Sequence, residues 1–234
     1  RNQVIIACAR IAIALRPKLI VFENVPNLAS SKFRPVLNRA LRIMRGAGYT
    51  AGFRVINARN FRVAQNRPRL LIVAALHTSR VRVLTALAAI ADHKAGEVTV
   101  AAAFAGLPAK GGTLLGSKIP NHTPMSHSKA VQAKIQRILP GTGPLSYRKL
   151  EPRGVASTMV CGHRALPCHY RAPRTITVRE AARLQSFPDT FVFKGPKGSQ
   201  MLQAANAVPP LMAAGVARRL LRLLHARRQS ALAG

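Results

Sequence analysis

The first 76 residues contain segments whose apolar positions follow helical and strand patterns in turn. Val4 to Leu15 carries apolar side chains nearly all round, together with good helix formers, which predicts a buried helix that stops at Arg16-Pro17. The short apolar run Leu19 to Phe22 predicts a buried strand. Tyr49 to Ile56 and Leu70 to Leu76 predict two further strands. The last run is almost continuously apolar, so we expect it in the centre of the sheet.

A second helix is predicted from about Arg34 to Arg45. Pro35 suits its first turn, and Gly46 and Gly48 end it. One side of this helix is apolar and comprises Val36, Leu37, Ala40, Leu41 and Met44. Arg39, Arg42 and Arg45 lie off that stripe. Helices and strands therefore alternate through this part of the chain.

Between His77 and Pro173 the alternation of helix and strand is lost. Turn residues accumulate there, as in Lys110-Gly111-Gly112 and Leu139-Pro140-Gly141. The pattern predicts a smaller, irregular domain inserted into the sheet-bearing one, with one helix from about Ser128 to Ile138.

Two further helices are predicted after the irregular segment. Thr177-Val178-Arg179-Glu180 has the spacing of a capping box, in which the Thr hydroxyl and the Glu carboxylate each accept from the other's backbone amide. This helix should end near Ser186. Leu211 to His225 predicts the last helix, with an arginine-rich polar stripe that we interpret as a solvated face.

The charge of the chain indicates a polyanionic partner. Thirty-seven Lys and Arg stand against six Asp and Glu, a formal net charge of +31. Such an excess repels itself unless a polyanion is present, which favours nucleic acid and salt-sensitive binding. Ribosome-associated and basic membrane-surface proteins share this bias, so charge alone does not choose among these classes.

Three cysteines in a chain of 234 residues fit a reducing cytosol, because a core of this size needs no disulfides. No apolar stretch approaches the ~20 residues that span a bilayer. There is no cleavable signal pattern, and the first residue is Arg rather than Met. We therefore expect a cytoplasmic, nucleoid-associated protein without a membrane partner, and a start that is internal to a longer gene product.

Four blocks of residues occur in a set order. They are Glu23-Asn24-Val25, Gln65-Asn66-Arg67-Pro68-Arg69, the segment Arg174 to Gln185, and Asn206-Ala207-Val208-Pro209-Pro210. Each block alone is weak evidence, but in this order they resemble the DNA cytosine-5 methyltransferase family, from the Glu-Asn-Val block onward. The resemblance implies an α/β fold: an incomplete Rossmann-like, S-adenosylmethionine-dependent methyltransferase domain with an inserted target-recognition domain. It assigns residues 1–76 to the C-terminal half of the catalytic domain, 77–173 to target recognition, and 174–234 to a family-type helix and the return to the catalytic domain.

The resemblance also implies the chemistry. In the family a thiolate attacks carbon 6 of a cytosine flipped out of double-stranded DNA, and a carboxylic acid acts at ring nitrogen N3. Glu23 matches that acid, and Asn24 would brace the adjacent nucleophile loop. Arg67 and Arg69 alternate along an extended stretch and so point the same way, which makes a fork for phosphate or a carbonyl oxygen. We therefore expect Glu23, Asn24, Arg67 and Arg69 to be catalytic.

Further sites follow from the same resemblance. Cofactor-binding residues would be Asn206, Ala207 and Val208, and S-adenosyl-L-methionine would be the cofactor. DNA-binding residues would be Gln65, Arg67, Arg69, Arg174, Thr177 and Arg179. The family usually has Gly where this chain has Ala205, and if that position needs a positive φ the substitution costs on the order of 1 kcal/mol. The Gly-Val-Pro before the Gln is likewise altered, to Arg62-Val63-Ala64.

The main departure is that the family's Gly-rich cofactor loop and Pro-Cys-Gln nucleophile loop, which precede the Glu-Asn-Val block, are not in this sequence. We expect the chain alone to be inactive. The alternatives are one subunit of a split methyltransferase whose second chain carries the N-terminal motifs, an inactive fragment that binds DNA, and an enzyme that methylates RNA cytosine. A role in restriction-modification would fit a DNA cytosine-5 methyltransferase.

Cys168 follows a proline, but it lies in the irregular segment, where the family has no nucleophile. Zinc is not expected at Cys161, His163, Cys168 and His169, because their spacing lacks the paired Cys-x-x-Cys of structural sites. We expect Cys161 to pack in the core and the two histidines to lie on a solvent or DNA-facing surface.

Overall fold

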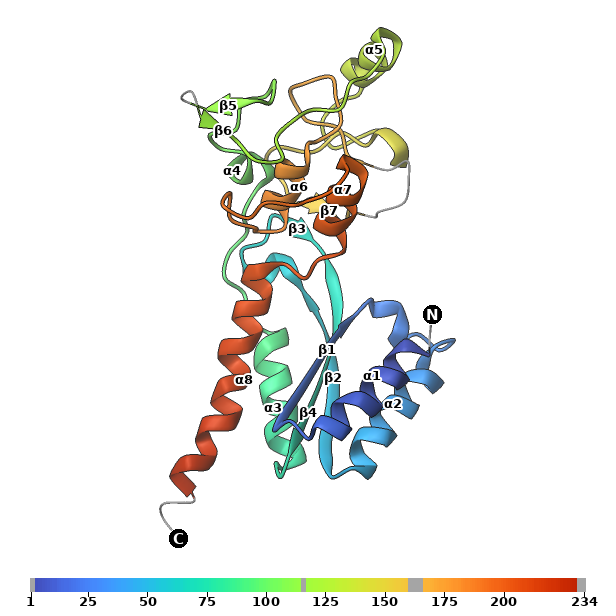
Figure 1. The fold of residues 1–234 in the computed structure, drawn as a ribbon, viewed down its shortest axis with the longest axis vertical. Helices are drawn as coiled ribbons and strands as arrows, with labels where there is room; N and C mark the ends of the chain where they lie inside the picture. The colour runs from blue at the N-terminus through green and yellow to red at the C-terminus, as the bar shows by residue number, and fades with distance from the viewer. Residues whose placement is uncertain (1–2, 115–116, 160–165, 231–234) are drawn as a thin grey trace. The chain divides into compact units, whose positions relative to one another are not determined.

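The computed structural model describes residues 3–114, 117–159 and 166–230 (Figure 1). The chain forms two compact units. Unit 1 comprises residues 1–57, 68–94 and 213–234, and unit 2 comprises residues 58–67 and 95–212. The polypeptide therefore passes between the units four times.

Unit 1 contains a three-stranded sheet. Its strands are β1 (Leu19–Asn24), β2 (Tyr49–Asn57) and β4 (Pro68–Leu76), in the order β1-β4-β2, and both pairings are antiparallel. The central place expected for the run Leu70 to Leu76 is confirmed, since Leu70 to Ala75 are all buried. The expectation that the first strand is fully buried is wrong: β1 is an edge strand of this sheet, and Val21 is 41% exposed.

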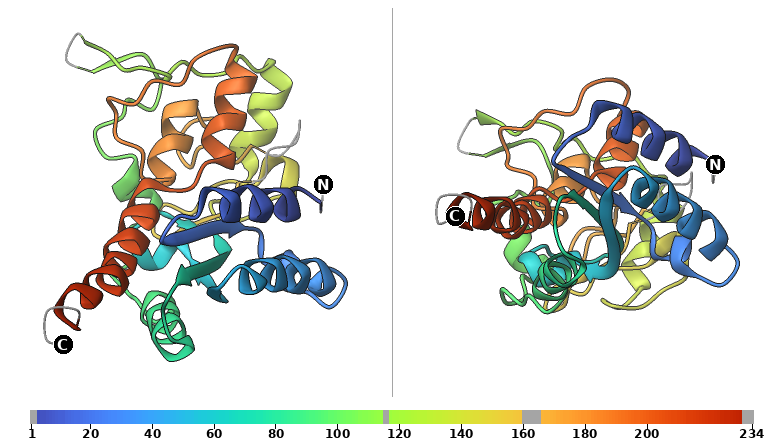
Figure 2. Two further views of the ribbon diagram at one scale, coloured as in Figure 1. Left: turned by 60° about the horizontal axis from the view of Figure 1, so that its bottom comes forward. Right: turned by 90° about the horizontal axis from the view of Figure 1, so that it is seen from below.

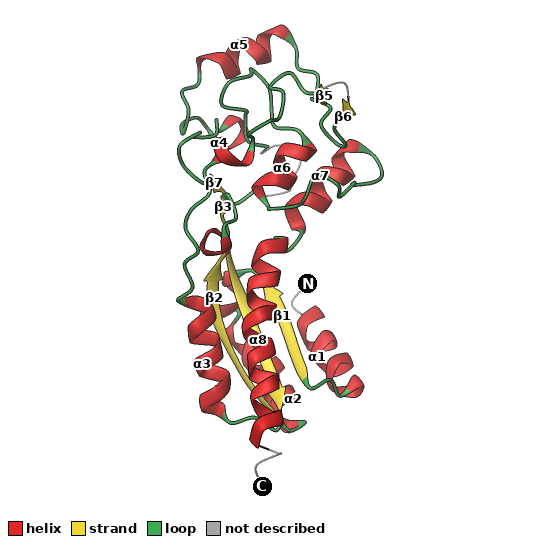
Figure 3. Ribbon diagram, turned by 90° about the vertical axis from the view of Figure 1, so that its left-hand side faces the viewer, coloured by secondary structure: helices red, strands yellow, loops and turns green. Residues whose placement is uncertain are grey.

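Helices cover both faces of this sheet (Figure 3). On one face lie α1 (Val4–Leu15) and α2 (Arg34–Gly46), which follows the short helix η1 (Pro26–Ala29). The buried side chains on this face belong to one core that includes Ile6, Leu37, Leu41, Met44, Ile20, Leu70 and Ile72. On the other face lies α3 (Arg80–Ala91), whose Leu84 and Leu87 approach Gly52 of β2. Because both faces are covered, β4 can be apolar along its whole length.

The last helix, α8 (Pro210–Ser230), enters unit 1 after Met212. Within unit 1, Arg219 of α8 donates from Nη2 to Nδ1 of His93, which follows α3, at 2.6 Å. The predicted helix Leu211 to His225 is confirmed in position and extends further at its C-terminal end. No described helix is long and apolar enough to cross a membrane.

Unit 2 consists of short elements joined by long loops, as Figure 2 shows from two further directions. Its helices are η2 (Ala58–Phe61), α4 (Val100–Ala103), α5 (Lys129–Arg137), η3 (Leu145–Tyr147), α6 (Val178–Leu184) and α7 (Lys197–Asn206). Its strands, two residues each, are β3 (Gln65–Asn66), β5 (Thr113–Leu114), β6 (Ser117–Lys118) and β7 (Ala156–Ser157). β3 pairs with β7 in parallel, and β5 with β6 antiparallel.

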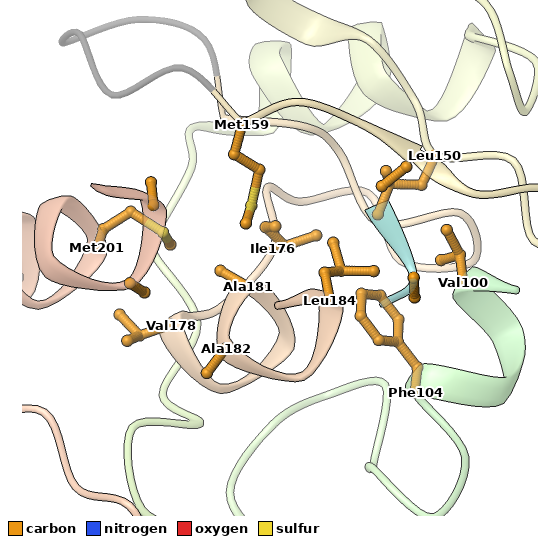
Figure 4. Packing of buried hydrophobic residues seen from close by; sticks show 14 of the residues in the cluster. Val100, Phe104, Leu150, Met159, Ile176, Val178, Ala181, Ala182, Leu184 and Met201 are labelled. Atoms are coloured by element: carbon orange, nitrogen blue, oxygen red, sulfur yellow. The ribbon is translucent and has the colours of Figure 1, made fainter. Parts of the chain in front are cut away.

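The core of unit 2 forms around α6 (Figure 4). Ala181, Ala182 and Leu184 of α6 pack with Ile176, Phe104 of the α4 end and Met201 of α7. The small side chains on α6 allow close packing, since alanine adds little bulk between the helix and its neighbours. The capping box of α6 is present as predicted, with Glu180 N donating to Thr177 Oγ1 at 3.1 Å and Thr177 N donating to Glu180 Oε2 at 2.7 Å.

The structural units do not follow the boundaries drawn from sequence. Residues 77–94 belong to unit 1, because α3 packs on its sheet, whereas residues 174–212 belong to unit 2, because α6 and α7 supply its core. Residues 58–67, between β2 and β4, also belong to unit 2.

Candidate functional site

Glu23 and Arg69 form an ion pair in unit 1. Glu23 lies near the carboxyl end of β1, opposite Leu71, and Arg69 lies two residues before Leu71 on β4. Alternation along the strands puts both side chains on the same face as diagonal neighbours. Arg69 Nε lies 2.7 Å from Glu23 Oε1, and the two side chains are 10% and 26% exposed. Burial lowers the pKa of Arg69, although the Glu23 carboxylate opposes this change.

The pair is held from the arginine side as well. Arg69 Nη1 donates to the carbonyl oxygen of Pro68 at 2.8 Å. The guanidinium is therefore fixed at two points, and it holds Glu23 at a strand end while part of the Glu23 side chain stays exposed. A carboxylate held this way is a candidate acid or hydrogen-bond partner for a small heterocycle.

Asn24 stabilises the turn that follows the strand. Its Oδ1 accepts from the backbone amide of Val25 at 2.8 Å, just before η1 begins at Pro26. Its expected role, bracing a nucleophile loop, stays a prediction.

In the part of the chain that the structure describes, Arg67 and Arg69 do not bind a common partner, as the expected fork would. Arg67 belongs to unit 2, where it is only 2% exposed, and its Nη2 donates to the carbonyl oxygen of Ala207 at 3.1 Å. Arg69 instead binds Glu23. In this structure Arg67 thus ties the segment before β4 to the segment after α7.

Gln65 is the most unusual polar residue of the block. It is fully buried on β3, and neither atom of its carboxamide has a hydrogen-bond partner among the residues described. Leaving a buried polar group unsatisfied costs about 1–3 kcal/mol. A ligand or an ordered water at this place would remove that cost.

Arg174 has a structural role in unit 2, and its expected contact with DNA stays a prediction. It is 7% exposed, and its Nη1 and Nη2 donate to the two carboxylate oxygens of Glu180 at 2.8 and 2.7 Å. It also donates to the carbonyl oxygen of Ala109. Burial alone would raise the pKa of Glu180, but the hydrogen bonds and charge of Arg174 outweigh burial and lower it. The pair is therefore charged and fully occupied.

Thr177 and Arg179 are also buried, at 2% and 0% exposed, and their expected contacts with DNA stay predictions. Arg179 donates to the carbonyl oxygens of Pro120, Pro188 and Phe191. Thr177 caps α6 and lies 2.9 Å from Nδ1 of His122. An arginine that binds three backbone carbonyls holds loops together.

Sequence reasoning missed two residues that complete this arrangement. His122 is 1% exposed and also contacts the carbonyl oxygen of Pro108 at 2.9 Å. Asn121 exchanges two hydrogen bonds with the backbone of Phe193. Together with Arg174 and Arg179 they fix the two ends of the loop that carries β5 and β6. The only signal in the sequence is the position of Asn121-His122 beside Pro120, which is too common to be informative.

The cofactor block lies at the end of α7 in unit 2. Asn206 is its last residue and is exposed, Ala207 is half-buried, and Val208 is 38% exposed. Ala205 is a buried residue within the helix and has no positive φ, so the free-energy cost considered for an alanine at this position does not arise. An accessible carboxamide and an accessible apolar side chain at the negative end of a helix dipole suit a cationic sulfonium nucleoside.

Cys168 is an inert core thiol. It is 0% exposed, and burial raises its pKa to about 11, so it has little thiolate at neutral pH. His169 is also buried, contrary to its expected surface position: its Nδ1 accepts from the amides of Arg171 and Ala172, and burial lowers its pKa to about 4. The described residues contain no His, Cys, Asp and Glu cluster that could hold a metal, while Cys161 and His163 lie outside them.

Comparison with known proteins places these features in a family. The family model for C-5 cytosine-specific DNA methylases matches residues 1–222. The type II methyltransferase M.XorII of Xanthomonas oryzae is 29% identical over 96% of this chain and 63% of its own length. M.AplI of Arthrospira platensis is 32% identical over 87% of this chain and 56% of its own length. The chain thus spans about six-tenths of these relatives.

Solved structures agree with the family assignment. A protein described as a DNA modification methyltransferase encoded within an E. coli prophage superposes with a TM-score of 0.80 at 25% identity, covering 96% of this chain and 74% of that one. The Dnmt2 methyltransferase of S. pombe gives a TM-score of 0.57 at 17% identity over 89% of this chain and 68% of its own, which is a likeness of fold. The expected Rossmann-like methyltransferase fold is confirmed. The chain belongs to the family of C-5 cytosine-specific DNA methylases.

Proposed function

We propose that this chain supplies the acid and the DNA-reading part of a DNA cytosine-5 methyltransferase, which moves a methyl group from S-adenosylmethionine to carbon 5 of a flipped cytosine. The observation that carries the proposal is the Glu23–Arg69 ion pair at the end of β1, in a chain of this family. The thiolate would come from the segment or partner chain that carries the family's Pro-Cys-Gln loop.

Glu23 would act at N3 of the cytosine ring. Protonation or hydrogen bonding at N3 stabilises the ring once a thiolate has added to carbon 6, and this makes carbon 5 nucleophilic. Arg69 would hold Glu23 in position through the 2.7 Å contact and would supply positive charge beside the base. Glu23 would carry out this step as the carboxylic acid, giving its proton to N3, and a side chain fixed on a strand need not reorganise when the base arrives.

S-adenosylmethionine would supply the electrophilic methyl group. Asn206 and Val208 are exposed at the end of α7, where they can bind polar and apolar parts of a nucleoside. Arg67 positions this segment by its hydrogen bond to Ala207.

Double-stranded DNA is the substrate that the charge of +31 favours. A bacterial relative named as a type II methyltransferase supports a cytoplasmic place for the enzyme, and association with the nucleoid would follow from DNA binding. We assign target recognition to residues 77–173, of which 95–173 lie in unit 2. The long loops of this stretch are the kind of element that presents variable side chains from a stable scaffold.

The test is Glu23→Gln in an assembly of this chain with the family's nucleophile-bearing segment. Methyl transfer from tritiated S-adenosylmethionine to duplex DNA should fall by roughly two to four orders of magnitude, the usual loss for a positioned acid or base. Binding of DNA and cofactor should persist, since glutamine has nearly the same shape.

The matched control is Glu97→Gln. Glu97 also pairs with an arginine, Arg59, but its side chain is 54% exposed and lies in unit 2. This variant should keep the parent rate. A Glu23→Gln enzyme within about threefold of the parent would remove Glu23 from the mechanism.

A further inference from the structure

Helix α2 of unit 1 carries a face of arginines that has no counter-charge among the described residues. We call Arg34, Arg39, Arg42 and Arg45 the α2 arginine face; all four are exposed. Leu37, Ala40, Leu41 and Met44 fill the opposite stripe and are buried against the rest of unit 1. Arg39 and Arg42 therefore point away from the core, and at a spacing of three residues they are neighbours on the helix surface.

The electrostatics of this helix are unfavourable in the free protein. Its first turn holds Arg34 and no acid, although the positive end of the helix dipole favours carboxylates. Arg39 and Arg42 repel each other, and so do Arg42 and Arg45. A bound polyanion would relieve this repulsion.

Unit 1 offers no acid that could relieve this repulsion. Its residue ranges contain nineteen Lys and Arg but only two acids, Glu23 and Asp92. Glu23 is paired with Arg69, and Asp92 caps α3 on the other face of the sheet. The counter-charge for α2 must therefore come from outside the unit.

Two members of the face are pre-arranged. Arg34 lies over the ring of Phe53, 5.1 Å from its centroid, and Arg45 Nη2 donates to the carbonyl oxygen of Ala51 at 2.9 Å. These contacts leave Arg39 and Arg42 as the two arginines at the centre of the face. From Arg34 to Arg45 the helix rises about 16 Å, which is the length of roughly five base pairs of duplex.

We propose that the α2 arginine face binds the phosphate backbone of double-stranded DNA, independently of sequence and apart from the Glu23–Arg69 site. It would add phosphate contacts that set affinity and hold the enzyme on DNA, while base reading stays with unit 2. The inference rests on the DNA-binding part of the proposed function and not on its catalytic part.

The test uses the 234-residue chain and a random-sequence duplex, with binding measured by fluorescence anisotropy over a series of salt concentrations. The variant is the double substitution Arg39→Gln and Arg42→Gln, which keeps good helix formers at exposed positions. The control is Arg10→Gln with Arg80→Gln, which removes the same charge from exposed positions on two separate helices. Circular dichroism confirms that both variants fold.

The slope of log affinity against log salt should become shallower by about 0.9 for each phosphate that the protein no longer neutralises, hence by close to 2 in the α2 variant. The control should change it by much less. Equal changes of the slope in both variants would mean that only net charge matters. An unchanged slope in the α2 variant would mean that the α2 arginine face does not touch DNA. Either result overturns the inference. If the parent chain binds no duplex at any salt concentration, both the inference about the α2 arginine face and the DNA-binding part of the proposed function fail. The Glu23 test is unaffected by that result.

Discussion

Glu180 should be the residue whose loss destabilises unit 2 most. Its carboxylate is 0% exposed and accepts two hydrogen bonds from Arg174 and one from the amide of Thr177, at 2.7 to 2.8 Å. Glu180→Gln would remove the negative charge and turn one acceptor into a donor that faces the guanidinium. Arg174 would then be a buried charge without compensation.

Breaking a buried ion pair from one side typically costs about 3–5 kcal/mol. With a urea dependence of about 2 kcal/mol per molar, the midpoint of unfolding should fall by roughly 1.5 to 2.5 M. Urea denaturation gives this shift, and hydrogen exchange of the α6 segment assigns it to unit 2. The pair of substitutions Arg174→Met and Glu180→Leu should cost less than either partner's loss alone, because no charge is left buried.

A loss of less than about 1 kcal/mol in the free energy of unfolding for Glu180→Gln would place the carboxylate in water and contradict a buried, charged pair. Additive effects of the two single substitutions would contradict the pair as well, since residues in one network should show an interaction energy of about 0.5–3 kcal/mol or more.

Three further predictions follow from single residues. His169 has a folded-state pKa of about 4 against an ordinary ~6.5. The stability that neutral, buried His169 contributes is therefore complete above pH ~6.5 and is lost as the pH falls toward 4. His169→Phe should flatten the dependence of the unfolding free energy on pH in that window. Gly111→Ala should lower the melting temperature of the chain, because φ is +78° and the new Cβ would collide with the ring of Pro124. Gly46→Ala is the control: it has open space around it and should leave the melting temperature unchanged or raise it. Cys168 should react with iodoacetamide at least about a hundredfold more slowly than half-buried Cys8, as followed by mass spectrometry; equal rates would contradict its burial.

The features predicted correctly from sequence are those that local chemistry decides. The capping box at Thr177 and the apolar run of β4 both appear as expected, since each depends on residues within one turn or one strand. Helix α7 was missed, because Lys197 to Asn206 contains Gly, Ser and Gln and has only a weak apolar stripe. Its helical form depends on packing of Met201 and Ala204 in the unit 2 core.

Arginine was the residue type whose role sequence could not decide. Arg39 is exposed, Arg69 is paired at the candidate site, and Arg174 and Arg179 are buried among carbonyls and a carboxylate. All four have the same appearance in a basic chain. Their partners lie up to 65 residues away in sequence, as with Arg174 and Ala109, so only the tertiary fold separates a DNA contact from a structural brace.

We assign target recognition to unit 2, and the order in which the chain enters its two units limits how that unit could be exchanged between enzymes. Residues 58–67 belong to unit 2 but are separated in sequence from the rest of it, residues 95–212. Their strand β3 pairs with β7. Beside this pairing the amide of Ala156 donates to the carbonyl oxygen of Ala64, and Thr158 Oγ1 donates to that of Asn66. A recombination event that transfers only residues 95–212 would leave the old β3 against a new β7. Grafts that carry both segments keep the pairing intact, so specificity in such a protein should be inherited in two linked pieces.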